Sequence, residues 1–280
     1  MDYNGDKVRR FTYIGDESVQ TKDLAYSSVE DQYRKFYRIV KEYLAELVPS
    51  QIDINKYFIN ADSPCEDINQ ILYVFLLSTQ DYQFLPNVIG LMKPERAPIF
   101  KRVLLDYNYS KILNTYTAVS LYEEFCISFN VKNMDSKGNS WRKYANSVIS
   151  SCEYLAKFKT ADAFNRYVES FNGSLEAAKK LQRSVNGMGL AIACNTLKDL
   201  GFANYSKPDI HLIDVMNSTG LSSRDEEDVF NAIRKVAKAN NDTPFNVDRS
   251  IWLICSGGYF MDGVKIPGQK GELISRLSEV

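Results

Sequence analysis

The segment 181–221 constrains the fold of this chain most strongly, because it predicts two helices joined by a very short turn. A polar and charged stretch, 174–183, ends at the sequence Val-Asn-Gly-Met-Gly, and apolar residues then recur at nearly helical spacing over 189–200. Gly187 and Gly189 allow positive φ angles and a close approach of the backbone to a neighbouring group. The first N–H groups of the second helix are left unpaired, so the turn predicts a binding site for an anion such as phosphate.

A lone acidic residue follows this turn. Asp209 lies in the sequence Pro-Asp-Ile-His, which ends at His211, and it stands at the start of another predicted helix, 209–218. One interpretation of Asp209 is an ordinary N-cap of that helix. His211 is the only histidine of the chain, and its simplest interpretation is a structural hydrogen-bonding residue.

The rest of the sequence predicts an all-α fold. Amphipathic stretches rich in Leu, Ala, Lys and Glu predict helices near 114–129, 141–157 and 161–171, and few runs alternate as β-strands do. Hydrophobic residues make up 45% of the chain and charged residues 25%, which is ordinary for a globular protein. No apolar run approaches the roughly 18 residues of a membrane span, and no signal peptide is evident, so the sequence predicts a cytoplasmic protein without membrane contact.

Taken together, these residues resemble the helix-hairpin-helix (HhH-GPD) superfamily of DNA glycosylases. Members carry a Leu-Pro-Gly-x-Gly hairpin that grips DNA phosphate, followed by a Val-Asp-x-His segment that supplies a catalytic aspartate. Here Gly187 and Gly189 correspond to the hairpin glycines, and Asp209 and His211 correspond to the Asp-x-His pair. The match continues through Ala193, Asn217, Gly220 and Leu221.

A second match lies upstream, in a predicted helix that begins near residue 66. Relatives end the corresponding helix with Leu-Leu-Ser-x-Gln, and residues 76–80 here read Leu-Leu-Ser-Thr-Gln. The resemblance implies that Gln80 enters the gap left by an extruded nucleotide. The alternative is that Gln80 is an ordinary polar residue at a helix end.

The resemblance implies two helical lobes with the active site in the cleft between them. Residues 66–200 would form a middle lobe, and residues 1–65 would join residues 201–280 in a second lobe. Asp209 would be the catalytic carboxylate, and His211 would support it. The residues expected to contact DNA are Gln80, Arg183, Gly187, Met188, Gly189 and Leu190.

Departures from the family pattern limit the expected chemistry. Members that also cleave the DNA strand carry a lysine where this chain has Ala191, so no Schiff base can form at that position. Lys207 is another amine near Asp209, although an exposed loop lysine is the simpler interpretation. Asp214 stands where many members carry arginine. The five cysteines are scattered and cannot supply the closely spaced set that holds an iron–sulfur cluster in some relatives, so no cofactor and no metal are expected.

The resemblance therefore predicts a monofunctional DNA glycosylase, a monomer that acts on double-stranded DNA containing a modified base. The substrate would be a damaged or mispaired base in DNA repair, or a hypermodified pyrimidine of viral DNA, such as glucosylated hydroxymethylcytosine, in defence against phage. A net charge of −1 argues against an extensive DNA-binding surface, and the alternative is a non-catalytic DNA-binding module. The local basic clusters are Lys93, Arg96, Lys101 and Arg102, and Lys179, Lys180 and Arg183.

Overall fold

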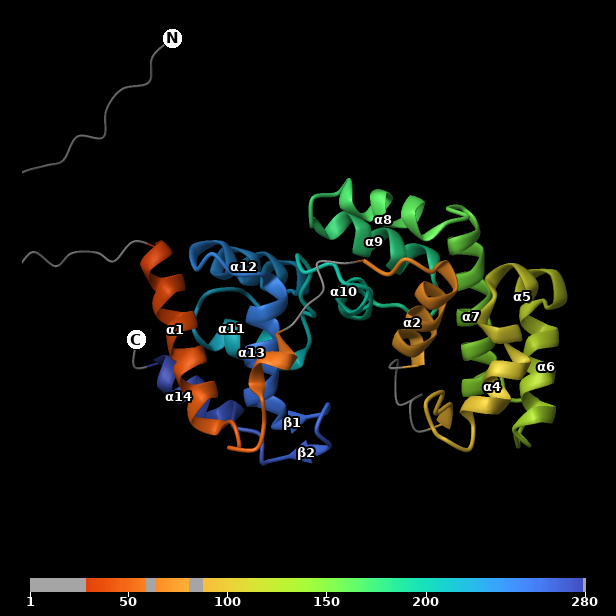
Figure 1. Cartoon of the computed structure of the whole chain (residues 1–280), viewed down its shortest axis with the longest axis horizontal. Coiled ribbons are helices and arrows are strands. Elements are labelled where there is room, and N and C mark those ends of the chain that lie inside the picture. Colours follow the sequence, from red (N-terminus) through yellow and green to blue (C-terminus); the bar gives the residue numbers. More distant parts are fainter. Residues whose placement is uncertain (1–28, 59–63, 81–87, 279–280) are drawn as a thin grey trace, which may run out of the picture.

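The computed structural model describes residues 29–58, 64–80 and 88–278, and within these ranges it confirms the all-α prediction (Figure 1). Residues 1–28 and 59–63 of the predicted second lobe therefore lie outside the described residues. The helices are α1 (Val29–Leu47), α2 (Ile68–Gln80), α4 (Ala97–Val103), α5 (Tyr109–Thr115), α6 (Ala118–Ser128), α7 (Ser140–Ala156), α8 (Ala161–Glu169), α9 (Leu175–Ser184), α10 (Leu190–Asp199), α11 (Ile210–Ser218), α12 (Glu226–Ala239), α13 (Pro244–Ser256) and α14 (Lys270–Ser278).

Two short 3₁₀ turns and one β-hairpin complete the described structure. The turns are η1 (Ile54–Tyr57) and η2 (Leu105–Tyr107), and the hairpin consists of β1 (Gly258–Tyr259) and β2 (Val264–Lys265). Its strands are antiparallel, with Gly258 opposite Lys265. None of the described helices combines the length and the apolar character that crossing a membrane requires.

The helices pack around two hydrophobic cores. Buried residues of the larger core come from 71–205, together with Phe230, and α7 packs there against α2, α5 and α6. Buried residues of the smaller core come from 36–57 and 212–277, so α1 packs against α12 and α13. We call residues 64–80 and 88–205 the central lobe and the other described residues the terminal lobe. Figure 1 shows α1 beside α12, α13 and α14, so that early and late segments of the chain share one lobe.

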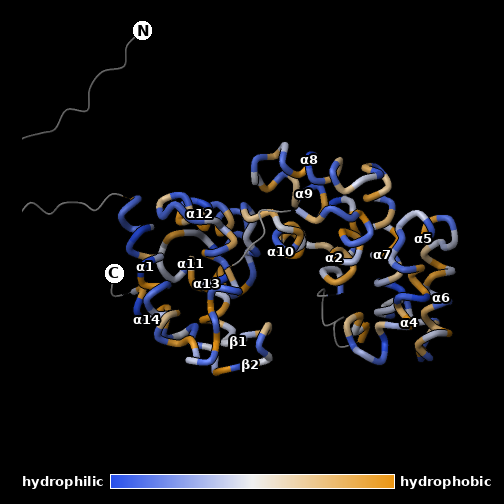
Figure 2. The backbone as a smooth tube through the Cα atoms, in the orientation of Figure 1, coloured by the Kyte–Doolittle hydropathy of each residue, from blue (hydrophilic) through white to orange (hydrophobic). Residues whose placement is uncertain are grey.

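The sequence pattern accounts for this packing. Hydrophobic positions recur between hydrophilic ones along the helices of both lobes (Figure 2), which gives each helix one apolar side to bury. Polar N-caps fix where helices begin: the side chains of Asn139, Thr160 and Thr243 each accept a hydrogen bond from a backbone N–H in the first turn of α7, α8 and α13.

A glycine directs the chain out of α13 and into the β-hairpin. Gly257 ends α13 in the left-handed conformation, with a φ of 64°. A Cβ atom at this position would lie 2.1 Å from the carbonyl oxygen of Ile266. Because no side chain fits in that space, only glycine lets the hairpin fold back directly beside the end of α13.

The two lobes contact each other through α10 and the segment that follows it. The backbone N–H of Phe245, on α13, donates a hydrogen bond to the carbonyl oxygen of Ala203 at 3.0 Å. Near the surface, Lys179 of α9 forms an ion pair with Glu227 of α12 at 2.9 Å. The central position of α10 between the two groups of helices is visible in Figure 1.

Candidate functional site

The predicted hairpin is the tight connection between α9 and α10. Gly187 has a φ of 80°, and a Cβ atom there would lie 2.9 Å from Oγ of Ser147 on α7. Position 187 therefore needs glycine both for its conformation and for its distance from α7. Gly189 is the N-cap of α10 with an extended backbone, and a Cβ atom built there meets open space.

The N–H groups of the hairpin fall into two sets. Asn186 N–H donates to Ser150 Oγ at 2.9 Å and Met188 N–H donates to Val185 O at 3.2 Å, so both are satisfied within the protein. By contrast, the N-cap residue Gly189 offers no side chain to the first N–H groups of α10. These groups and the positive end of the helix dipole are available to an anion.

A groove of about 650 Å³ lies against this hairpin. Lys143 of α7 contributes to its lining, and Arg183 at the end of α9 is exposed. The side chains of Met188 and Leu190 are buried in the core of the central lobe. Both residues were predicted to contact DNA, but only their backbone atoms are able to reach a ligand. Lys143 was not predicted, because it comes from a helix distant in sequence.

Asp209 is the N-cap of α11. Its Oδ1 atom accepts hydrogen bonds from the backbone N–H groups of His211, at 2.9 Å, and Leu212, at 3.3 Å. Its Oδ2 atom has no hydrogen bond to the described residues. The Nδ1 atom of His211 is buried and has no hydrogen-bond partner in that part of the chain. His211 therefore holds the Asp209 carboxylate through its backbone and not through its imidazole.

Asp248 of α13 fixes the segment that leads to Asp209. Its Oδ2 atom accepts a hydrogen bond from the backbone N–H of Lys207 at 2.6 Å and from Nζ of Lys198 at 2.8 Å. Asp248 is 1% exposed and Lys198 is 5% exposed. Asp209 N–H in turn donates to Lys207 O at 2.7 Å. One buried carboxylate thus links α10, α13 and the turn before the candidate catalytic residue.

A cleft of about 650 Å³ separates the lobes beside this junction, and we call it the interlobe cleft. Residues of α2 and α10 line one side, and residues of α13 and the β-hairpin line the other. Its polar side chains include Asn195, Asp199, Lys207 and Arg249, and its aromatic side chains include Phe245, Trp252 and Phe260.

The cleft wall contains Gln80, which was a predicted site residue, and Asp199, which was not. Gln80 is buried at the end of α2, and its Oε1 atom accepts a hydrogen bond from Leu91 N–H at 3.1 Å. Asp199, at the end of α10, accepts a hydrogen bond from Nδ2 of Asn195 at 2.7 Å. Partial removal from bulk water raises the pKa of the Asp199 carboxyl, although Lys198, Arg249 and Lys207 favour its charged form. No motif in the sequence pointed to Asp199.

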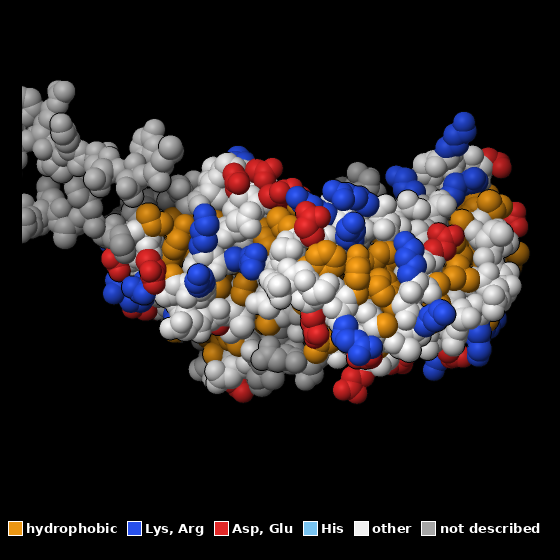
Figure 3. Space-filling model, turned by 90° about the horizontal axis from the view of Figure 1, so that it is seen from above, with side chains coloured by type: hydrophobic (Ala, Val, Ile, Leu, Met, Phe, Trp, Pro, Cys, Tyr) orange, Lys and Arg blue, Asp and Glu red, His pale blue; other side chains and the backbone are white. Residues whose placement is uncertain are grey.

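Most of the predicted basic clusters are engaged within the protein. Arg96 donates to the carbonyl oxygen of Ile89 at 2.6 Å and lies over the ring of Trp141. Lys101 is near Asp106 at 3.8 Å. On the face shown in Figure 3, basic and acidic side chains of the described residues are interspersed, without a broad area of one sign. On this face, a DNA-binding surface would therefore depend on a few local cations.

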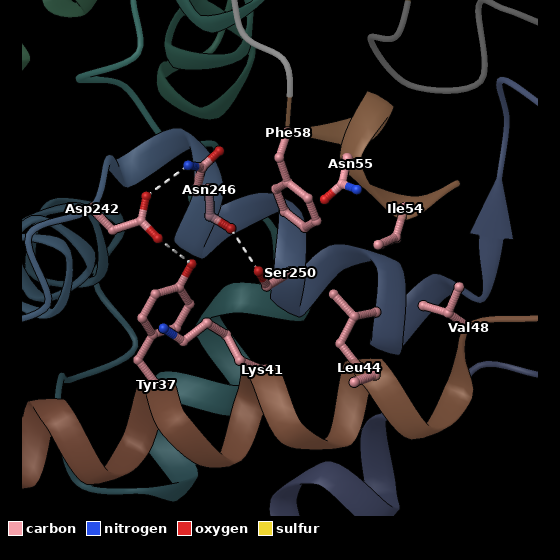
Figure 4. Close-up of a pocket in the computed structure, with 11 residues that line it drawn as sticks. Tyr37, Lys41, Leu44, Val48, Ile54, Asn55, Phe58, Asp242, Asn246 and Ser250 are labelled. Carbon is pink, nitrogen blue, oxygen red and sulfur yellow. Dashed lines mark hydrogen bonds between the residues drawn. The ribbon is translucent and has the colours of Figure 1, made fainter. Parts of the chain in front are cut away.

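A separate cavity, of about 250 Å³, lies within the terminal lobe between α1, η1 and α13 (Figure 4). At its polar end, the Asp242 carboxylate accepts hydrogen bonds from Tyr37 Oη at 2.9 Å and from Asn246 Nδ2 at 2.6 Å. Burial raises the pKa of the Tyr37 hydroxyl. Its apolar wall includes Leu44 and Phe58, and it shares no lining residue with the interlobe cleft.

The described residues contain no group of three or more His, Cys, Asp or Glu side chains arranged to hold a metal ion. All five cysteines are free thiols. No model of a known protein family, no curated protein and no solved structure matches this chain.

Proposed function

We propose that this protein is a monofunctional DNA glycosylase whose catalytic carboxylate is Asp209, beside the interlobe cleft. The observation that carries the proposal is the path of one continuous segment. It begins at the hairpin with unpaired N–H groups, follows α10 along the cleft, and reaches Asp209 two residues after the cleft residue Lys207. Phosphate binding and a fixed carboxylate would thus be coupled by α10 and the segment that leads from it to Asp209.

The carboxylate geometry suits glycosidic bond cleavage. Departure of a base builds positive charge on the sugar, and a fixed carboxylate nearby stabilises that charge or orients an attacking water. Two backbone N–H groups hold Oδ1 of Asp209, which leaves Oδ2 for the sugar or the water. The target nucleotide must first rotate out of the duplex, because neither the base nor its sugar carbon is accessible within the stack.

The lining of the interlobe cleft combines polar and aromatic side chains. Its volume of about 650 Å³ is in the range of small-molecule sites and accommodates a base that carries a substituent. Asn195, Asp199 and Lys207 offer hydrogen-bonding groups, and Trp252 offers an aromatic face. The proposed substrate is either a hypermodified pyrimidine with a hydroxylated substituent, for which these polar groups offer partners, or a damaged or mispaired base.

A lobe arrangement of the HhH-GPD type belongs to the same proposal. Its support is the division of the described residues into a central core and a core shared by early and late segments. Ala191, which has no amine, stands two residues after Gly189, and this supports base release without strand cleavage.

Asp209→Asn tests the proposal, because asparagine caps a helix about as well as aspartate but cannot carry the charge. The wild-type protein and the variant are incubated with duplexes containing uracil, oxidised purines or alkylated bases, and with hypermodified viral DNA, and abasic sites are counted. We expect release of one base class by the wild type and a loss of at least about 100-fold in the variant, with DNA binding and thermal stability retained.

A non-catalytic DNA-binding module is the second candidate, and the N-cap role of Asp209 is the observation that favours it. DNA binding by the wild type without abasic sites on any substrate would support this candidate. Undiminished base release by Asp209→Asn would instead exclude Asp209 as the catalytic group.

A further inference from the structure

Two apolar side chains are exposed at the turn between β1 and β2. Phe260 is 51% exposed and Met261 is 54% exposed, and both line the interlobe cleft. Met92, which is 66% exposed, lines the same cleft from the central lobe. Exposed apolar side chains grouped at the edge of a cleft are typical of a binding surface.

The turn is held firmly against the terminal lobe. Tyr57 Oη donates a hydrogen bond to Asp262 Oδ2 at 2.7 Å and accepts one from Met261 N–H at 3.1 Å. Lys56 forms an ion pair with the same Asp262 carboxylate. The two apolar side chains therefore project from a backbone that is already fixed. Little further backbone entropy would be lost when a partner binds them.

A cation that forms no ion pair among the described residues accompanies the turn, although its charge also favours the ionised form of Asp199. The Arg249 guanidinium lies 5.1 Å from the ring centre of Phe260 and 5.1 Å from that of Phe245. Arg249 has no ion pair within the described chain, and its Nε atom is buried without a hydrogen-bond partner. The edge of the Phe260 ring also meets Trp252, with ring centres 6.0 Å apart. An apolar tip above a guanidinium complements a ligand with both flat apolar surfaces and negative charge.

We propose that the Phe260–Met261 turn inserts into the base stack of duplex DNA where a nucleotide has been extruded, with Arg249 near the adjoining phosphate. This inference rests on the proposed function. Proteins that unstack DNA insert Phe, Met or Leu side chains between base pairs, because the exposed base faces are apolar. Gln80, to which the resemblance gives this role, is buried, and its side-chain oxygen accepts a hydrogen bond from Leu91 N–H. The gap would therefore be filled from the terminal lobe.

Binding to a duplex with a stable abasic-site analogue, compared with an intact duplex of the same sequence, tests this inference. A fluorescent base analogue beside the gap reports unstacking. We expect the wild type to prefer the gapped duplex by about tenfold and Phe260→Ala/Met261→Ala to lose this preference and the fluorescence change, since base stacking on a side chain contributes on that scale. Affinity for the intact duplex is expected to change less than about twofold.

Two further variants separate the inference from misfolding. Ile127→Ala removes a side chain that is 77% exposed on α6 of the central lobe, and it is expected to behave as the wild type. Met261→Ala alone leaves the ring contacts of Phe260 in place, and it is expected to lose part of the preference with unchanged thermal stability.

The outcomes distinguish this inference from the proposed function. A double variant that keeps the full preference and fluorescence change overturns the inserted turn, while base release by the wild type would leave the proposed function standing. A wild type that binds neither duplex overturns both proposals. Dissociation of a wild-type oligomer by the double substitution, without a change in DNA binding, would assign the turn to a protein contact and also overturn the inference.

Discussion

Nζ of Lys198 donates a hydrogen bond to Oδ2 of Asp248 at 2.8 Å, and both side chains are almost fully buried where the two lobes meet. A buried ion pair stabilises a fold little in net terms, because desolvation of both charges offsets their attraction. Loss of one partner has a much larger effect, because the remaining charge stays buried without compensation.

Lys198→Met and Asp248→Asn are each expected to lower the free energy of unfolding by about 3–5 kcal/mol. Asparagine retains an acceptor for Lys207 N–H, so the Asp248 variant isolates the loss of charge. The Lys198→Met/Asp248→Asn double variant is expected to be less destabilised than either single variant. Urea denaturation provides the measurement. If the losses of unfolding free energy in the two single variants add up to the loss in the double variant, the two charges do not interact energetically.

The two hairpin glycines are expected to respond differently to substitution. Gly187→Ala places a Cβ atom in the left-handed region and 2.9 Å from Ser147 Oγ, so we expect a loss of about 1–2 kcal/mol in the free energy of unfolding. Gly189→Ser is expected to leave stability unchanged or slightly raised, because serine is a favourable N-cap and the space there is open.

Gly189→Ser also tests the anion site, because the serine hydroxyl would occupy the N–H groups offered to phosphate. We expect weaker binding to duplex DNA and a shallower dependence of affinity on salt concentration, measured by fluorescence anisotropy. Equal affinity and salt dependence in the wild type and Gly189→Ser would remove the hairpin from the DNA-binding surface.

The pH dependence of stability is expected to include a contribution from Asp214. Hydrogen bonds from Lys270, at 2.6 Å, and Arg224, at 2.9 Å, hold the pKa of its carboxyl below the usual range. A depressed pKa in the folded state means that the stabilisation is fully present above the unfolded-state pKa of about 4 and is lost as the pH falls through the folded-state pKa.

Asp214→Asn is therefore expected to lower the free energy of unfolding by about 1 kcal/mol at pH 7. The difference from the wild type is expected to vanish as the pH falls through the folded-state pKa, and chemical denaturation across the acid range measures it. Asp135→Asn, in the exposed connector between α6 and α7, is the matched control and is expected to have little effect. A deficit that persists at low pH would point to a lost packing contact.

Borohydride trapping is expected to give no covalent adduct between the wild-type protein and DNA from which it has released a base. Ala191 has no amine, and trapping requires a Schiff base. A bifunctional glycosylase serves as the positive control. If an adduct forms with the wild type and is absent in Lys207→Met, strand cleavage through Lys207 replaces the monofunctional prediction.

The sequence predicted regular helices better than their interruptions. The predicted helices 141–157 and 161–171 correspond to α7 and α8, because a strong apolar period and a polar N-cap agree in each. The predicted helix 114–129 was wrong in its first part. Thr117 and Ser120 form a capping box that begins α6, and the extended backbone before it separates α6 from α5.

The β-hairpin was not predicted, because strands of two residues are too short to show alternation. For the candidate site, the sequence identified residues that share one short segment, such as Gly187 and Asp209. It did not identify Asp248 or Arg249, which approach that segment only after α13 has packed against it. Their roles depend on tertiary contacts that no local pattern records.

The construction of the terminal lobe from early and late segments imposes an order on biosynthesis. Tyr37 of α1 bonds to Asp242, 205 residues later in the chain. At translation rates of about 5–20 residues per second, the apolar side of α1 remains without its packing partners, α12 and α13, for roughly 10–40 s. The central lobe is complete earlier in synthesis, so α1 is the segment most exposed to chaperones and proteases while the chain is unfinished.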